Sequence, residues 1–484
     1  MRRHRAASPE RQTALPLRQY AEQAFSRAAG APLVAGNSVR ILRNAAENYP
    51  AWLTAIRAAQ HKVYFENYII ADDAVGREFA AALAERARAG VRVRVIYDWM
   101  GALGAASRRV LQPVAAAGGE VRCFNPPRLD SPFGWVSRDH RKMVAVDGQV
   151  GFVTGLCASR KWTGDPARGV EPWRDTGLEV RGPAIADMER AFAEVWATMG
   201  ARVPDEELTD ADTIPVAGGV TLRMLATVPI VAGLYRLDQL IAAMARRTLW
   251  LTDAYFVGVA PYVQALRAAA LDGVDVRLLV PGASDLPVIS PLSRAGYRPL
   301  LEAGIRVFEW NGSMLHSKTA VADCRWARVG SSNLNIASWI GNYELDVAVE
   351  NEDFAAAMQA MYEEDLLNAT EIVLSARNRV RPAMQRPRRR ERPRGGSASR
   401  AAAGALRIGN TVGAAITNRR VLGPAEAGTM AGAGLALLGL VAVVIVWPLI
   451  LALPLGAIGV WMAISFLARA KELRAQRGRE HESP

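Results

Sequence analysis

The chain has 484 residues, of which half are hydrophobic, and a formal net charge of +12. This length is sufficient for two or three domains. Its three cysteines are too few and too scattered for a disulfide framework, and none has the paired spacing of a zinc site. The N-terminal residues MRRHRAASPERQ are charged and no apolar segment follows them, so they do not form a secretory signal peptide. We expect residues 1–36 to be a flexible arm.

Two stretches of the sequence, near residues 62–99 and 247–280, repeat one pattern of apolar strand, helix and apolar strand. KVYFENYII, REFAAALAERARAGV and VRVRVIYDW follow one another in the first stretch, and RTLWLTDAYFV, PYVQALRAAALDGV and DVRLLV in the second. Apolar strands that alternate with helices predict βαβ units and a largely parallel sheet. The sequence therefore predicts two tandem homologous α/β domains, at residues 37–210 and 215–375, with a polar linker at 204–219.

The composition changes after residue 375. Residues 376–426 are rich in Arg, Pro, Gly and Ser and predict a basic linker. Residues 427–468 contain no charge, which is enough for two spans of about 20 residues each, with Pro448 and Pro454 where a turn would lie. We predict a C-terminal transmembrane helical hairpin, with one kinked span or a buried core hairpin as alternatives. Its basic flanks, including the tail at 469–484, place both ends in the cytoplasm.

The positive charge is concentrated in this C-terminal part. Residues 377–484 carry 18 Arg and Lys against 5 Asp and Glu, a net charge of +13, which leaves −1 for residues 1–376. A nonspecific nuclease carries basic charge around its catalytic groove, because phosphate contacts dominate its binding. The distribution favours anionic lipid as a partner, and no nucleic acid is expected.

Two copies of the pattern His-x-Lys-x4-Asp stand 176 residues apart, one in each predicted domain. The chain has only five histidines and five lysines, so the repeat is a specific signal. Residues two apart on a strand project from the same face, so each His–Lys pair points into one site. The copies are His140/Lys142/Asp147 and His316/Lys318/Asp323.

These residue types suit a reaction at phosphorus. One imidazole can attack the phosphorus atom while the other protonates the departing oxygen. Two lysine ammoniums can stabilise charge on the transferring group as compact point charges. The sequence contains no acidic cluster that indicates a required cation, so no metal and no cofactor are expected.

At these motifs the sequence resembles the phospholipase D superfamily and, within it, the bacterial cardiolipin synthases. The resemblance covers most of residues 37–375, and three further patterns carry it. They are Trp173-Arg174-Asp175-Thr176, Gly330-Ser331-Ser332-Asn333 and Asn342-Tyr343-Glu344. It implies two phospholipase D-like domains that share one pseudo-twofold active site.

The resemblance also implies roles for the reacting groups. His140 would be the nucleophile that forms a phosphohistidine intermediate. His316 would be the general acid and then the base that activates the acceptor alcohol. Asp175 and Glu344 would be the acids that orient the two histidines.

Other positions follow from the same resemblance. Asp147 and Asp323 would mainly order their local loops, whereas Ser331 and Asn333 would bind substrate. Cys157 stands ten residues after Asp147, where the first repeat should carry an Asn, and a thiol is a weak donor in place of an amide. Four more residues fall where family members line the site, although a tyrosine at a strand end more often packs half-buried. They are Tyr68, Asp98, Tyr255 and Tyr297.

The implied activity is transfer of a phosphatidyl group from phosphatidylglycerol or a similar phospholipid to a lipid or polyol hydroxyl. Water as the acceptor would give phosphatidic acid instead, so a phospholipase D hydrolase is the first alternative. A phospholipase D-like nuclease is an alternative of another class, and a non-catalytic membrane protein with this fold is a third. The expected location is the bacterial inner membrane, with the catalytic domains on the cytoplasmic side.

Overall fold

A computed structural model describes residues 17–101, 105–127, 137–285, 293–294, 296–374 and 380–382, with a few isolated positions in the C-terminal segment. The predicted hairpin at 427–468 and the tail at 469–484 lie outside the described residues apart from those positions, and so does most of the linker at 376–426. No helix in the described ranges combines the length and the apolar composition that a membrane span requires. The hairpin therefore remains a prediction from sequence.

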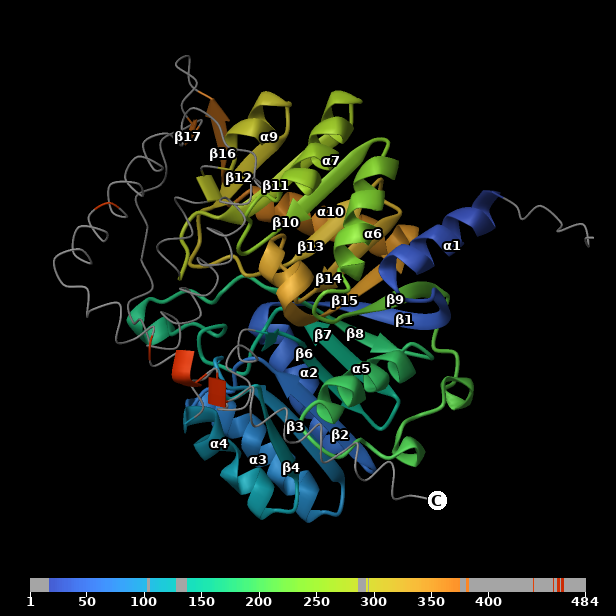
Figure 1. The fold of residues 1–484 in the computed structure, drawn as a ribbon, viewed down its shortest axis with the longest axis vertical. Helices are drawn as coiled ribbons and strands as arrows, with labels where there is room; N and C mark the ends of the chain where they lie inside the picture. Colours follow the sequence, from blue (N-terminus) through green and yellow to red (C-terminus); the bar gives the residue numbers. More distant parts are fainter. Residues whose placement is uncertain are drawn as a thin grey trace, which may run out of the picture.

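The first half is a mixed sheet with helices packed on it (Figure 1). Pairing is parallel among β2, β3 and β4 and antiparallel from β2 through β6, β7 and β8 to β1. Across the sheet the strands are β4 (Glu120–Phe124), β3 (Arg92–Asp98), β2 (Lys62–Asn67), β6 (Lys142–Val146), β7 (Val150–Thr154), β8 (Thr176–Arg181) and β1 (Val34–Arg43). The helices are α2 (Asn44–Ala58), α3 (Ala74–Arg88), α4 (Ala105–Ala116) and α5 (Ile185–Ala197).

The second half repeats this order. Its strands across the sheet are β12 (Arg306–Trp310), β11 (Asp275–Pro281), β10 (Thr248–Thr252), β13 (Thr319–Ala322), β14 (Trp326–Gly330), β15 (Asn342–Glu350) and β9 (Val220–Thr227). β16 (Ala369–Leu374) and β17 (Val380–Pro382) extend the sheet beyond β12. The helices are α6 (Gly233–Met244), α7 (Ala260–Leu271), α9 (Arg298–Glu302) and α10 (Glu352–Leu366).

The prediction of a largely parallel sheet is wrong. Among the described strands, parallel pairing within each half is limited to three neighbours, which follow one another through crossover helices. The strand that follows each His–Lys pair returns antiparallel beside β2 or β10, and tight turns then lead into the next strand. The βαβ patterns correctly predict parallel strands where a helix connects them. Strands that follow one another through short turns are antiparallel instead.

The two sheets are joined through β1. Val34 and Asn37 pair with β9 of the second half, and the stretch from Ser38 to Arg43 pairs with β8 of the first. The N-terminal residues expected to be a flexible arm include helix α1 (Leu17–Ala29), whose Phe25 and Ala29 pack in the core of the second half. The interdomain segment contains short 3-10 turns at Asp205–Glu207 and Ala211–Thr213.

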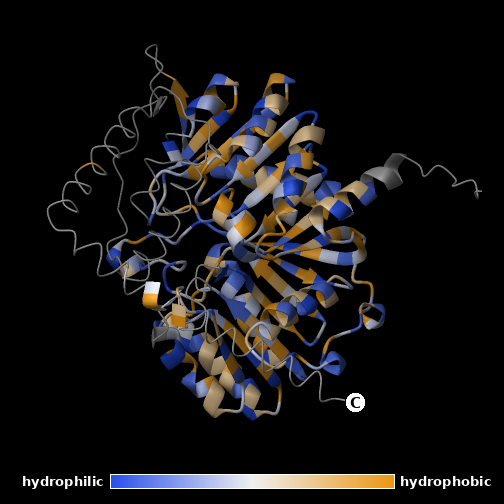
Figure 2. Cartoon of the chain, viewed as in Figure 1, coloured by the Kyte–Doolittle hydropathy of each residue, from blue (hydrophilic) through white to orange (hydrophobic). Residues whose placement is uncertain are grey.

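One hydrophobic core is shared between the halves. It includes Leu178 and Val180 of β8 together with Leu345 and Val347 of β15, all fully buried. Figure 2 shows hydrophobic residues along the strands and hydrophilic residues over the outer helix surfaces. Because burial of apolar surface is the main stabilising term in folding, this shared core holds the two sheets in a fixed relation and so positions the site between them.

Candidate active site

Each His–Lys motif is hydrogen-bonded to the other half of the molecule. β5 (Arg138–Asp139) pairs in parallel with the start of β15, and the His140 amide donates to the Tyr343 carbonyl at 2.9 Å. In the matching contact the His316 amide donates to the Arg174 carbonyl at 2.7 Å, while the Arg174 amide donates to the Met314 carbonyl at 2.8 Å. The two motifs thus lie where the halves meet.

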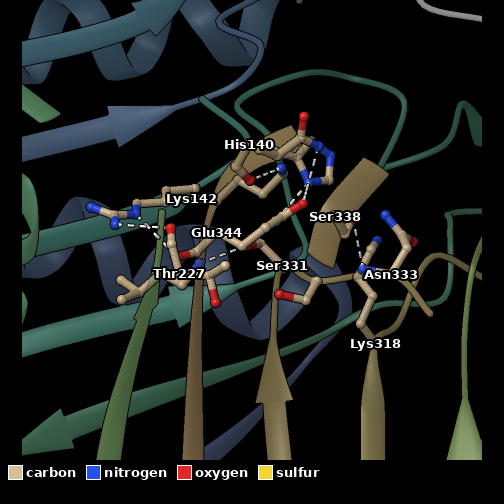
Figure 3. Close-up of polar contacts among 12 residues, drawn as sticks. His140, Lys142, Thr227, Lys318, Ser331, Asn333, Ser338 and Glu344 are labelled. Carbon is tan, nitrogen blue, oxygen red and sulfur yellow. Dashed lines mark hydrogen bonds and ion pairs between the residues drawn. The ribbon is translucent and has the colours of Figure 1, made fainter. Parts of the chain in front are cut away.

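Each histidine pairs with an acid from the opposite half. His140 Nδ1 lies 3.0 and 2.9 Å from the two carboxylate oxygens of Glu344, as Figure 3 shows. His316 Nδ1 lies 2.8 Å from Asp175 Oδ2. A carboxylate that accepts from Nδ1–H fixes the tautomer and leaves Nε2 for chemistry. The structure therefore brings the four sequence-predicted groups together as two crossed pairs.

The two lysines lie beside the histidines of their own motifs. Lys142 Nζ donates to the His140 carbonyl and Lys318 Nζ to the His316 carbonyl. Lys318 Nζ also lies 2.8 Å from Nδ1 and 3.1 Å from Nε2 of His316. All four side chains are buried, with residue exposures between 1% and 4%. Charges in such a water-poor site act more strongly than at the surface.

The His316–Asp175 pair holds its charge on the acid. Burial alone would raise the pKa of Asp175, but His316 and Lys318 together with hydrogen bonds hold it below its ordinary value. One of those bonds comes from Trp162 Nε1 at 2.8 Å. Burial and the Lys318 charge lower the pKa of His316 to about 3, against the opposing effect of Asp175. Asp175 is therefore ionised and His316 is neutral at neutral pH.

Glu344 has the opposite tendency. Burial raises its pKa to about 7, although the Lys142 charge and several hydrogen bonds oppose the shift. Ser331 Oγ donates to Glu344 Oε2 at 2.6 Å and Asn342 Nδ2 to Oε1 at 3.3 Å. Acids whose environments push their pKa values apart are suited to different tasks in one reaction.

A tyrosine ring lies beside each of the two histidines. The Tyr68 ring centroid lies 5.0 Å from that of His140, and the Tyr255 centroid lies 5.9 Å from that of His316. Tyr297 is buried in the hydrophobic core of the second half.

Asp98 accepts hydrogen bonds from the backbone N–H of Asp139 and from the Arg138 side chain. These two residues immediately precede His140.

Two neighbours of the site were missed by the reasoning from sequence. Trp162 binds Asp175 and packs edge-on to His316 with centroids 5.2 Å apart. Arg141 is fully buried and donates to the carbonyls of Glu344 and Thr227 at 3.1 and 3.2 Å, which ties the first motif to β15 and β9. Trp162 lies outside the repeated motifs, and Arg141 occupies the variable position between His140 and Lys142, so motif spacing singles out neither residue.

The motif aspartates lie at the far ends of the strands that follow the histidines. Both adopt left-handed backbone conformations, with φ of 54° at Asp147 and 52° at Asp323. Each carboxylate accepts three backbone amides at 2.7–2.9 Å: Asp147 those of Gln60, His61 and Lys62, and Asp323 those of Arg246, Arg247 and Thr248. Strand β6 begins at Lys142 and ends at Val146, which places Asp147 roughly 15 Å from Lys142 along the chain. Their contacts therefore order the entries to β2 and β10.

The predicted substrate-binding positions differ between the halves. Ser331 binds Glu344 directly, as described above, and so positions that acid. The backbone N–H of Asn333 donates to Ser338 Oγ at 3.1 Å. The side-chain oxygen Oδ1 of Asn333 is buried and has no hydrogen-bond partner among the residues described. Cys157 is buried at the matching position; burial raises the pKa of its thiol, while Lys142 and Lys318 lower it.

Comparison with known proteins identifies the family. The profile described as cardiolipin synthase, PLD-like domain, matches residues 52–196 and 238–366, once in each half. The chain belongs to the cardiolipin synthase family of phospholipase D-like proteins. This membership confirms the predicted family, the repeat, and the predicted enzyme class, a phospholipase D-type phosphatidyltransferase.

Relatives in this family match most of the chain. Cardiolipin synthase A of Pseudomonas aeruginosa (strain LESB58) is 33% identical over 368 residues, which cover 75% of this chain and 74% of that protein. A cardiolipin synthase of Geobacillus sp. (strain WCH70) is 31% identical over 358 residues, covering 72% and 70%. Among solved structures, phosphatidylserine synthase of Haemophilus influenzae shares the fold, with a TM-score of 0.58 and 13% identity over 81% of this chain and 99% of that one.

Proposed function

We propose that this protein is a cardiolipin synthase-like enzyme. It moves a phosphatidyl group from phosphatidylglycerol or a similar phospholipid to a lipid or polyol hydroxyl. The observation that carries the proposal is the crossed pairing of His140 with Glu344 and of His316 with Asp175, which makes one site with two oriented imidazoles. The printed names of the relatives support a phospholipid substrate.

In the first step His140 Nε2 attacks phosphorus, and the bond from phosphorus to the headgroup oxygen breaks. His316 Nε2 gives its proton to that oxygen, so the headgroup leaves as an alcohol. His316 must first gain this proton. The negative charge of an entering phosphodiester raises the pKa of the imidazole and so favours protonation.

In the second step His316 takes the proton of the acceptor hydroxyl. The acceptor oxygen attacks the phosphorus, and the bond to His140 breaks. Lys142 and Lys318 stabilise the negative charge on the phosphorus oxygens in both steps. Glu344 and Asp175 hold each ring with Nδ1–H toward the acid and Nε2 toward the phosphorus. Neither step requires a cofactor.

The setting that we propose is the bacterial inner membrane, with the catalytic halves on the cytoplasmic side. The uncharged residues 427–468 and their basic flanks support this location. A bilayer holds the donor and acceptor lipids at high local concentration. Attachment to it would bring both substrates to one site.

The test is mass-spectrometric product analysis of the full chain in phosphatidylglycerol vesicles. We expect cardiolipin and glycerol from the wild type and neither from His140→Ala or His316→Ala, with His61→Ala as the control because that exposed histidine lies outside the site. Phosphatidic acid as the sole product would instead identify a hydrolase. Absence of any lipid product would contradict the proposal, and DNA cleavage at low salt would then favour the nuclease.

The order of attack needs a separate measurement. Vesicles with phosphate-labelled phosphatidylglycerol are quenched in alkali, where a phosphohistidine bond survives. We expect covalent label on the wild-type protein and none on His140→Ala. Label retained by His140→Ala would make His316 the nucleophile and reverse the two roles.

A further inference from the structure

Asn67 lies beside the first His–Lys pair and has an unused hydrogen-bond donor. It is the last residue of β2 and stands opposite Lys142 in the antiparallel register. Residues opposite each other in such a pair have neighbouring side chains on one face of the sheet, so the Asn67 side chain lies beside that of Lys142, the lysine of the first motif. The Asn67 side chain is fully buried, and its Oδ1 accepts from the Ala158 amide at 3.3 Å. Its Nδ2 has no hydrogen-bond partner within the described part of the chain.

The second half has counterparts of Asn67 and Cys157, and there the side-chain amide stands at the other of the two positions. Thr252 pairs with Thr319, so Asp253 is the counterpart of Asn67 and lies next to Lys318. Asp253 Oδ2 accepts from the Leu334 amide at 2.7 Å, as Asn67 Oδ1 does from the matching amide of the first half. The second half therefore combines an acid on this strand with an amide at Asn333.

In the first half the amide stands on the strand, at Asn67, and the loop position holds Cys157. Each half thus carries one side-chain amide at these two positions, on the loop in the second half and on the strand in the first. A thiol is a weak donor, so Cys157 does not replace the amide of Asn333 in function. The side-chain amide that is absent at Cys157 is therefore present on the strand, at Asn67.

The surroundings of Asn67 indicate what would satisfy its free N–H groups. Buried donors without a partner are rare in folded proteins, and each needs a physical explanation. Asn67 stands opposite Lys142 in the strand register, and an ammonium group donates hydrogen bonds but accepts none. The missing acceptor is therefore best supplied by an anion that enters the site.

We propose that Asn67 is a substrate-binding residue whose amide donates a hydrogen bond to a non-bridging oxygen of the phosphodiester, in place of the donor that Cys157 lacks. This inference rests on the proposed function, since it needs a phosphodiester between the two histidines. The burial of Asn67 matches that of His140 and Lys142, which are only 2% and 1% exposed.

Asn67→Asp is the matched variant for the test. An aspartate keeps the acceptor for the Ala158 amide, as Asp253 shows in the second half, but it removes the donor. We expect kcat for phosphatidyl transfer in phosphatidylglycerol vesicles to fall about 10²-fold, the effect of losing one preorganised donor. The thermal unfolding midpoint should stay near that of the wild type.

The double variant Asn67→Asp/Cys157→Asn recreates in the first half the acid–amide pair of Asp253 and Asn333. We expect it to recover at least about tenfold of the lost kcat, because the amide donor returns while the added charge remains. A purely structural role of Asn67 would not produce this rescue. Cys324→Asn, at a turn remote from the site, is the control for introducing an asparagine.

Binding of inorganic phosphate, measured by calorimetry on the full chain in detergent, gives a readout apart from turnover. We expect weaker binding by Asn67→Asp and recovery in the double variant. Wild-type kcat and phosphate affinity in Asn67→Asp, or no recovery in the double variant, would overturn the inference while leaving the proposed function intact. A wild type that binds phosphate but makes no lipid product would contradict the proposed function. The phosphate affinities of the wild type and the two variants would then decide whether Asn67 binds the anion.

Discussion

The first half of the molecule supplies a short acid, Asp175, to His316, and the second half supplies a longer one, Glu344, to His140. Asp175 has a pKa held below its ordinary value, whereas burial raises the pKa of Glu344 to about 7. Both acids stand at the start of matching strands. The same scaffold therefore gives one histidine an ionised partner and the other a partner that titrates near neutrality.

The neighbours of the two acids explain part of this difference. Ser331 donates to Glu344 in the second half, and the matching position of the first half is Gly155. A Cβ at Gly155 would lie 2.3 Å from Asp175 Oδ1, so no larger residue fits there while the acid holds its place. Trp162 binds Asp175 instead. The two halves thus share one strand order but surround their acids with different residues.

The largest expected effect is on the acids themselves. Asp175→Asn should lower kcat about 10³-fold or more, because an amide no longer stabilises the charged imidazole or fixes its tautomer. Glu344→Gln should cost less at pH 7, since Glu344 is already partly protonated there. The wild-type rate should change as pH rises through about 7, where Glu344 loses its proton, and this step should vanish in Glu344→Gln but persist in Asp175→Asn.

Pre-steady-state rates of the two variants between pH 5 and 9 give this comparison directly. Equal losses, with the step near pH 7 present in both, would show that the two acids act alike. The difference in their surroundings would then have no consequence for the reaction.

A smaller effect is expected from an ion pair that joins the halves. Arg174 Nε and Nη2 donate to the two carboxylate oxygens of Asp365 on α10 at 2.7 and 2.9 Å, and the counterpart of Arg174 is the uncharged Tyr343. Because the pair is largely buried, Asp365→Asn leaves the guanidinium without its counter-charge. We expect the free energy of unfolding to fall by about 3 kcal/mol in urea titrations.

The neighbouring Glu364→Gln is the control. Glu364 pairs with Arg43 at the surface, where an ion pair contributes less than about 1 kcal/mol. Equal destabilisation by the two variants would mean that burial of the Arg174–Asp365 pair does not matter for the joining of the halves.

The smallest effect should come from the motif aspartates. Asp147→Asn and Asp323→Asn each weaken a set of three backbone contacts and should lower the free energy of unfolding by about 1–3 kcal/mol. Burial opposes ionisation of Asp323, but its backbone hydrogen bonds hold its pKa below the ordinary value. Its stabilisation is thus present above about pH 4 and is lost as pH falls further. The difference between wild type and Asp323→Asn should shrink in unfolding titrations below pH 4; a difference that grows there would contradict the assignment.

The sequence by itself determined which residues recur together as a motif. The prediction that each motif starts on a strand is wrong for His140, His316 and Lys318, because β6 begins only at Lys142 and β13 only at Thr319. The repeat and the family followed from motif spacing. The hairpin predicted for residues 427–468 likewise depends only on local composition, and it stays a prediction.

Only the tertiary structure decided which groups face one another across the halves. Glu344 reaches His140 over 204 residues and Asp175 reaches His316 over 141, although nothing local to either acid specifies its partner. The exchange of the amide between Asn67 and Asn333 became visible only from strand register. Local periodicity is set by backbone geometry within a strand, whereas partners between strands are set by the packing of a core that the two halves share.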